Sequence, residues 1–284
     1  MGRPTRTRLC LESRRIAAAA IIFAAACGRG AADVGEAPDA RTRGWVPREG
    51  SRLQRDAAPI AASTALSPPA APVLQVSRAR SEIHPTGRFD VNAWGGSVNT
   101  HTLLDASGKG AVPVSEARFL WGQGNLYVFF YAGDLDIQVR TVKHDGPIWK
   151  DDSVTFAFFP PGLPDAGAPS KFVIAATPTG VVSDGLCPQD ATDLSDERCD
   201  LTWESGARVG ADFDGTLNTI GDFDEEWAVE LSVPLRSIGI DPARRRPVEI
   251  AATMRRCEMA HDGPRACGLW GDENRPGVLL LEDP

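Results

Sequence analysis

The apolar positions of residues 78–284 fall in short runs and show almost no helical periodicity. The runs are rich in Val, Ile, Phe, Tyr and Trp, and Gly, Pro, Asn or Asp residues separate them, which is typical of strands and turns. The alternation is regular in residues 226–233, where Trp227, Val229, Leu231 and Val233 share one face. This pattern predicts a strand with one face in the core and the other solvated or lining a groove.

Residues 117–131 predict a β-hairpin. Two apolar runs, 117–121 and 126–131, flank the turn-forming residues 122–125, and the second run is apolar on both faces. We therefore expect the second strand to lie in the middle of a packed pair of sheets. Further strands are expected at residues 153–159, 171–177, 206–211, 226–233, 248–256 and 278–281, and a single helical turn at 236–240. Roughly eight or nine short strands predict an all-β, antiparallel sandwich or jelly roll, forming one domain over residues 78–284.

The first 77 residues have a different pattern. Five Arg residues precede the uncharged run 16–26, which is shorter than the about 20 residues that span a bilayer, so residues 1–26 predict a secretory signal peptide. The sequence Ala-Ala-Ala-Cys at 24–27 resembles a bacterial lipobox, which predicts lipidation of Cys27 and attachment to a membrane. Ordinary cleavage at an A-x-A site is the alternative. Residues 27–77 are rich in Ala, Pro, Gly, Ser and Arg and predict a disordered, lipid-anchored linker.

Composition and charge indicate which classes of protein and partner the chain can belong to. The chain is 42% hydrophobic and 24% charged, as folded soluble proteins are, and its formal net charge is −8. Because the signal peptide is basic, the net charge of residues 27–284 is more negative than that of the whole chain. Phosphate backbones would repel this part of the chain, so nucleic acid is not an expected partner. We expect an exported protein, either an outer-membrane lipoprotein or a periplasmic or cell-surface protein.

Four cysteines follow the linker, at positions 187, 199, 257 and 267. An even number of cysteines in an exported chain predicts disulfides, and no C-x-x-C or C-x-x-C-H spacing points to zinc or covalent haem. Four cysteines allow three pairings. We favour Cys187 with Cys199 and Cys257 with Cys267, because each pair would close a polar loop locally.

Five short motifs occur in a fixed order: Phe-Asp-Val-Asn-Ala-Trp at 89–94, a Phe-Leu-Trp-Gly to Asn-Leu-Tyr-Val hairpin at 119–128, Trp-Lys-Asp-Asp-Ser-Val at 149–154, Trp-Ala-Val-Glu-Leu-Ser-Val-Pro at 227–234, and Leu-Trp to Pro-Gly-Val-Leu at 269–279. This series resembles the family 9 carbohydrate-binding modules. The resemblance implies a non-catalytic jelly roll that binds sugar chain ends and carries structural calcium.

The resemblance also implies which residues contact a sugar. Trp149 stands at one of two Trp positions whose rings sandwich a pyranose, although in this loop it could also serve as a lid. Thr155 stands where the family has Glu, and Val173 where it has Arg. Trp270 matches a Trp near the site or caps the sandwich. Arg255, at the end of a strand, could bond a ligand or form an internal salt bridge.

Two further sets of residues have alternative roles. Asp151 and Asp152 could supply hard oxygen ligands to calcium, or their carboxylates could accept hydrogen bonds from turn amides. Trp94, Trp121 and Trp227 lie in strand-like contexts and are expected to pack in the core.

The sequence therefore predicts a non-catalytic carbohydrate-binding domain. A structural or partner-binding surface lipoprotein that has kept the scaffold and lost the sugar site is the alternative. An electron-transfer subunit that holds haem b would have to use Met254 or Met259. An enzyme is disfavoured, because no nucleophile motif or nucleotide loop occurs and His84, His101, His144 and His261 lie apart.

Overall fold

The computed structural model describes residues 71–282, except 112, 160–170, 220, 246 and 261–262, and the side chains of 260 and 263–266. These residues belong to one compact unit. The predicted signal peptide, Cys27 and most of the predicted linker lie outside the described residues. Within the described part of the chain, no helix is long and apolar enough to cross a bilayer.

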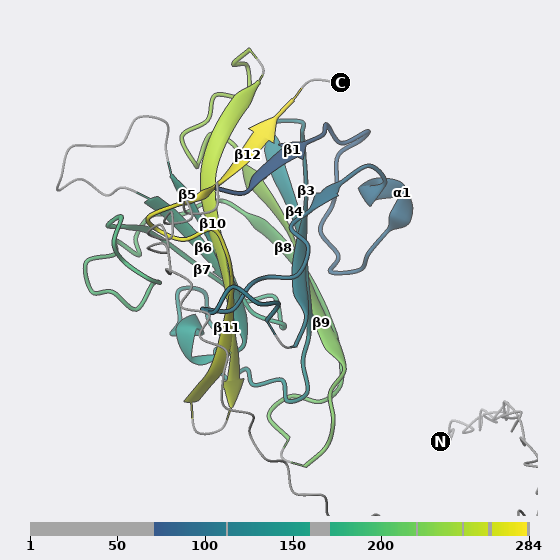
Figure 1. Cartoon of the computed structure of the whole chain (residues 1–284), viewed down its shortest axis with the longest axis vertical. Coiled ribbons are helices and arrows are strands. Elements are labelled where there is room, and N and C mark those ends of the chain that lie inside the picture. The colour runs from purple at the N-terminus through teal and green to yellow at the C-terminus, as the bar shows by residue number, and fades with distance from the viewer. Residues whose placement is uncertain are drawn as a thin grey trace, which may run out of the picture. The chain divides into compact units, whose positions relative to one another are not determined.

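Two β-sheets face each other and form the domain (Figure 1). The larger sheet has seven strands, in the order β1-β12-β10-β5-β6-β7 with β11 beside β10, and the smaller has five, in the order β2-β3-β4-β9-β8. The strands of the larger sheet are β1 (Val73–Val76), β12 (Gly277–Leu281), β10 (Val248–Ala260), β5 (Ser153–Phe159), β6 (Lys171–Ala176), β7 (Val182–Cys187) and β11 (Gly263–Trp270). Those of the smaller sheet are β2 (Val98–Asn99), β3 (Ser115–Gly122), β4 (Asn125–Gly133), β9 (Glu226–Pro234) and β8 (Arg208–Asp214).

Strand pairing is antiparallel except between β1 and β12, which run parallel. The helical elements of the described residues are short: α1 (Val91–Trp94) and the 3₁₀ turn η1 (Ile148–Lys150). The predicted all-β, antiparallel sandwich is confirmed.

The core lies between the two sheets and follows the predicted alternation. Trp227, Val229, Leu231 and Val233 of β9 all point into it, and β4 lies in the middle of the smaller sheet, as its apolar pattern predicts. The other face of β4 is also covered, because Ile83 and Trp94 of the segment before β2 pack on its outward aromatic side chains. The two apolar faces of β4 therefore pack in two separate hydrophobic clusters, one between the sheets and one outside them.

Several elements differ from the sequence prediction. Strand β1 lies inside the predicted linker and pairs with β12, so the folded domain begins by Val73 and the predicted boundary at 78 is too late. Only Val76 of β1 is buried, which leaves little apolar signal in the sequence. Strands β2, β7 and β11 were also not predicted; β7 contains Ser, Asp and Gly, and β11 begins Gly-Pro. Residues 236–240 form hydrogen-bonded turns and no helix.

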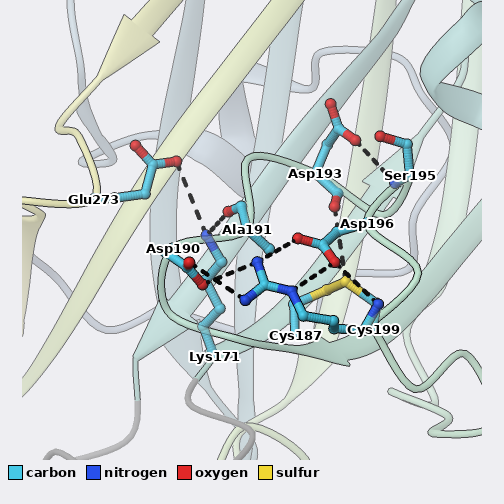
Figure 2. Close-up of a disulfide and its surroundings, with 10 residues drawn as sticks. Lys171, Cys187, Asp190, Ala191, Asp193, Ser195, Asp196, Cys199 and Glu273 are labelled. Carbon is cyan, nitrogen blue, oxygen red and sulfur yellow. Dashed lines mark hydrogen bonds and ion pairs between the residues drawn. A yellow bond between two sulfur atoms is a disulfide. The ribbon is translucent and has the colours of Figure 1, made fainter. Parts of the chain in front are cut away.

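Both favoured disulfides are present. Cys187 at the end of β7 is bonded to Cys199, and Cys257 of β10 is bonded to its cross-strand partner Cys267 of β11. The first closes the loop that follows β7 (Figure 2). The second joins the two strands of a hairpin.

Candidate functional site

Three of the predicted sugar contacts lie on the outer face of the seven-stranded sheet. Val154 and Phe156 point into the core, so Thr155 between them points outward, directly across from Arg255 on β10. Trp149 is half-buried and packs on an outer-face cluster that includes Ala157, Phe159 and Val173. The structure therefore brings Trp149, Thr155 and Arg255 to the same face.

Trp270 lies on the opposite face of that sheet. Its ring is buried in the main core, with its centroid 6.4 Å from that of Phe119. The ring also lies against Gly277, where a Cβ atom would come within 2.3 Å of it. Trp270 thus fills the sandwich, as the cap alternative expects, and does not face Trp149.

The disulfide-closed loop, which Figure 2 shows, packs on this outer face. Ala191 and Leu194 of this loop are buried in the same cluster as Val173. Asp193 of the loop pairs with Arg255, at 2.8 Å between Nη1 and Oδ2. Arg255 is therefore held by an internal salt bridge to the chain's own loop, as the salt-bridge alternative expects.

Lys171 of β6 also contacts this loop (Figure 2). Its buried ammonium donates a hydrogen bond to the carbonyl oxygen of Ala191 and lies 3.9 Å from a carboxylate oxygen of Glu273. Burial lowers the pKa of Lys171, against the opposing effect of Glu273 and other acidic neighbours. A buried charge with few partners costs stability, so this contact orders the loop at an energetic cost.

Asp151 and Asp152 accept hydrogen bonds from backbone amides. Asp151 accepts from the N–H groups of residues 140 and 141, at 3.0 and 2.8 Å, and Asp152 from those of residues 138 and 259, both at 2.7 Å. Burial and the neighbouring Asp134 carboxylate raise the pKa of Asp152 to about 8. The nearby positive charge is the guanidinium of Arg256, 2.7 Å from Asp134. All four oxygens accept amide protons, as the hydrogen-bonding alternative for this pair expects.

The outer face of the five-stranded sheet carries a groove of about 640 Å³ that sequence reasoning missed. Its aromatic lining includes Phe89, Phe129 and Tyr131. Phe89 is 48% exposed, and its ring packs edge-on against that of Phe129 with 5.2 Å between centroids. The guanidinium of Arg118 lies 5.3 Å from the Phe89 ring centroid. The groove thus has an aromatic floor that is partly open to solvent.

Glu230 fixes the segment that carries Phe89. This buried carboxylate on β9 accepts hydrogen bonds from the Trp94 indole N–H at 2.8 Å, the Thr86 N–H at 2.6 Å and the Gly87 N–H at 3.3 Å. Gly87 has a φ of +81°, and a Cβ atom there would lie 2.3 Å from the backbone of residue 211. Glycine is therefore required where this segment crosses β8.

Charged side chains surround the aromatic floor. Arg88 pairs with Asp212 at 2.9 Å and Arg118 with Glu116 at 3.0 Å. The remaining charged lining residues are the acidic Asp214 and Glu226, so the rim carries an excess of negative charge. Glu226, which accepts a hydrogen bond from the Tyr131 hydroxyl, raises the pKa of Tyr131 to about 12. Tyr131 therefore stays neutral at physiological pH.

The sequence did contain a partial signal for this groove. Phe129 and Tyr131 alternate with the core residues of β4 and give the strand its second apolar face. A strand that is apolar on both faces predicts packing on both. The pairing of this face with Phe89, forty residues earlier in the chain, depends on the tertiary fold.

Comparison with known proteins gives a likeness of fold. No protein-family model and no curated protein sequence matches the chain. A candidate carbohydrate-binding protein from Bacteroides uniformis superposes with a TM-score of 0.54 at 12% identity, covering 74% of this chain and 99% of that one. A family 9 carbohydrate-binding module from Caldicellulosiruptor kristjanssonii, solved with cellotriose, superposes with a TM-score of 0.50 at 12% identity, covering 75% of this chain and 94% of that one. The chain therefore has the fold of the family 9 carbohydrate-binding modules.

Proposed function

We propose that this chain is a non-catalytic carbohydrate-binding domain, and that a sugar chain lies in the groove over the five-stranded sheet. The observation that carries the proposal is the partly exposed ring of Phe89 beside Tyr131, inside a charged rim. A pyranose has an apolar face of C–H groups and a rim of hydroxyls, so an aromatic surface with convergent polar groups matches both. The fold likeness to a module solved with cellotriose supports the same ligand class.

The charge of the groove favours a neutral sugar. Four carboxylates and two guanidinium groups line it, and the two guanidinium groups already form ion pairs with Asp212 and Glu116. An anionic glycan would also meet the carboxylates of Asp214 and Glu226 and be repelled. Neutral oligosaccharides can use the same carboxylates as hydrogen-bond acceptors for their hydroxyls.

This placement replaces the predicted contact with Trp149. That ring is half-buried on its own cluster, and Arg255 beside it is paired with Asp193. If the sugar nevertheless binds at Trp149, the disulfide-closed loop would have to move away. The two placements make opposite predictions for two single variants, which an experiment can separate.

The test is an isothermal calorimetric titration of the protein with each member of a panel of neutral oligosaccharides that includes cellotriose. Phe89→Ala should weaken binding about 2- to 13-fold, since a good aromatic contact is worth about 0.5–1.5 kcal/mol. Phe223→Ala is the matched control, because Phe223 is 85% exposed and does not line the groove. Trp149→Ala should leave affinity unchanged. Loss of binding in Trp149→Ala but not in Phe89→Ala would overturn the groove as the site.

A surface protein that binds another protein is the second candidate. The outer face of the seven-stranded sheet favours it, because Asp193 of the chain's own loop pairs with Arg255 there and Ala191 and Leu194 pack on the same face. A negative oligosaccharide screen together with capture of a defined envelope protein would support this candidate. The haem b alternative has no such support, since Met254 is buried in the main core and Met259 is also buried.

We also propose export and attachment to a membrane through Cys27. Two disulfides support an oxidising compartment, because such bonds persist in exported proteins and are rare in the cytosol. Cys27 itself lies outside the described residues. Metabolic labelling with a fatty acid tests the anchor: label should enter the protein and be absent from Cys27→Ala, and unlabelled protein in the membrane fraction would contradict it.

A further inference from the structure

A second cluster of ionisable side chains lies at the edge of the sandwich, away from the groove. It contains His144 and Asp145 from the loop before η1, Asp184 from the edge strand β7, and Glu204 from the segment before β8. The ligand atoms of His144, Asp145 and Glu204 lie within 4.8 Å of one another. Asp184 and Glu204 follow His144 and Asp145 by about 40 and 60 residues in the sequence, and His144 has no metal-binding motif around it.

Asp184 is the unusual member of this cluster, because one of its carboxylate oxygens is buried without a hydrogen-bond partner among the described residues. The residue is 1% exposed, and Oδ2 accepts a hydrogen bond from the Ser205 N–H at 2.9 Å. The other oxygen, Oδ1, accepts no hydrogen bond from the described part of the chain and lies 4.0 Å from Nε2 of His144. A buried carboxylate oxygen without a donor is costly, which implies that a cation completes its environment.

The distances fit a single metal ion. Nε2 of His144 lies 3.0 Å from Oε2 of Glu204 and 3.5 Å from Oδ2 of Asp145, in addition to 4.0 Å from Oδ1 of Asp184. Two ligand atoms that each lie about 2.0–2.1 Å from a tetrahedral ion are about 3.3 Å apart. The distances to Glu204 and Asp145 lie close to this value, whereas Asp184 is farther away, as expected for a residue that supports the site without binding the ion.

The backbone holds two of these carboxylates in position. The Asp184 N–H donates to Oδ1 of Asp145 at 3.3 Å, which leaves Oδ2 of Asp145 facing His144. His144, Asp184 and Glu204 also line a cleft of about 290 Å³. An ion and its remaining water ligands can therefore reach the cluster from solvent.

We propose that His144, Asp145 and Glu204 bind one divalent transition-metal ion, such as Zn²⁺, and that the buried carboxylate of Asp184 supports this site from beside His144. An imidazole nitrogen with carboxylate oxygens is a ligand set for Zn²⁺ and its first-row neighbours, whereas Ca²⁺ takes oxygen ligands alone. Three carboxylates around one imidazole also supply the negative charge that a divalent ion neutralises. The site is separate from the groove, so metal binding and sugar binding can be tested independently.

The experiment is a calorimetric titration of EDTA-stripped protein with Zn²⁺ at neutral pH, with Co²⁺ as a spectroscopic probe. We expect one Zn²⁺ per chain and visible Co²⁺ absorption that Zn²⁺ displaces. His144→Ala and Asp184→Asn should each weaken Zn²⁺ binding at least about 10-fold, the smallest loss usual for groups that support a metal site. Glu249→Gln, at an exposed carboxylate on β10, should leave affinity unchanged.

Thermal melting gives a second readout, because an ion that binds only the folded state raises its stability. Zn²⁺ should raise the melting temperature of the unmodified protein but not of His144→Ala, whose side chain is 48% exposed and can be removed without opening the core. Without metal, Asp184→Asn should melt no lower than the unmodified protein, because it removes an uncompensated buried charge. Absence of saturable Zn²⁺ binding, or equal binding in both variants, would overturn the proposal. Tighter binding of Ca²⁺ than of Zn²⁺ would overturn the role of the imidazole.

Discussion

Replacing Glu230 by Gln should destabilise the domain and disturb the groove. Three donors converge on Oε2 of Glu230, namely the N–H and hydroxyl of Thr86 and the N–H of Gly87, while the Trp94 indole donates to Oε1. An amide keeps only one acceptor oxygen. Its NH₂ group would then face at least one buried N–H donor, with no acceptor between them.

The magnitude follows from these contacts. One buried donor left unsatisfied costs about 1–3 kcal/mol, and the surviving bonds lose the advantage of a charged acceptor, so Glu230→Gln should cost about 2–4 kcal/mol in total. For a domain of this size the melting temperature should fall by roughly 5–15 °C. Urea unfolding followed by tryptophan fluorescence measures the free energy directly. Oligosaccharide affinity should fall as well, because the same segment carries Phe89.

A double-mutant cycle tests the geometry more sharply. Trp94→Phe removes the indole donor, so when it is combined with Glu230→Gln it relieves the contact between two donors. The double variant should therefore be less destabilised than the sum of the single variants, by about 1–2 kcal/mol. Glu249→Gln, an exposed change of the same kind, should stay within about 0.5 kcal/mol. Additive effects, or a Glu230→Gln cost as small as this control, would refute the assigned hydrogen bonds.

Three further predictions concern stability. The free energy of unfolding should rise with pH between the lowered pKa of Lys171 and its ordinary value of 10.5, because in this range the unfolded state keeps the ammonium proton that the folded state has lost. In Lys171→Met, measured across the same pH range, this rise should disappear. Replacing Cys187 and Cys199 by Ser should cost about 3 kcal/mol in urea unfolding, as expected for a loop of about 15 residues, and an unchanged free energy of unfolding would contradict this stabilisation. Asp152→Asn should cost about 1–3 kcal/mol, because its NH₂ group would face a backbone donor, and unchanged calorimetric melting would contradict those bonds.

The strands that the sequence predicted correctly are those whose side chains face an apolar layer. In β9 and β4 the alternation determines both the strand and the face that packs, and both agree with the structure. The sequence does not predict strand β1, because backbone pairing with β12, and not side-chain burial, holds this strand in the sheet. Backbone hydrogen bonds can form with almost any residue type, so the sequence does not reveal them.

The sites were harder to predict for a related reason. The sequence does not show that Thr155 and Arg255 lie across from each other on neighbouring strands, or that Asp193 of the disulfide-closed loop pairs with Arg255. The groove joins Phe89 to Tyr131 across the fold, and the proposed metal site joins His144 to Glu204. Such pairings depend on which loops the sheets bring together.

The parallel pairing of β1 with β12 determines how the domain would respond to mechanical force. Val73 lies beside Val278 and Val76 beside Leu281, so the chain enters this pair at one end and leaves it at the other. A pull applied in opposite directions at Pro72 and Glu282 would load all the rungs between the two strands at once, in shear. Strands arranged to unzip would instead release one rung at a time. The outermost pair of the larger sheet is thus placed to resist extension.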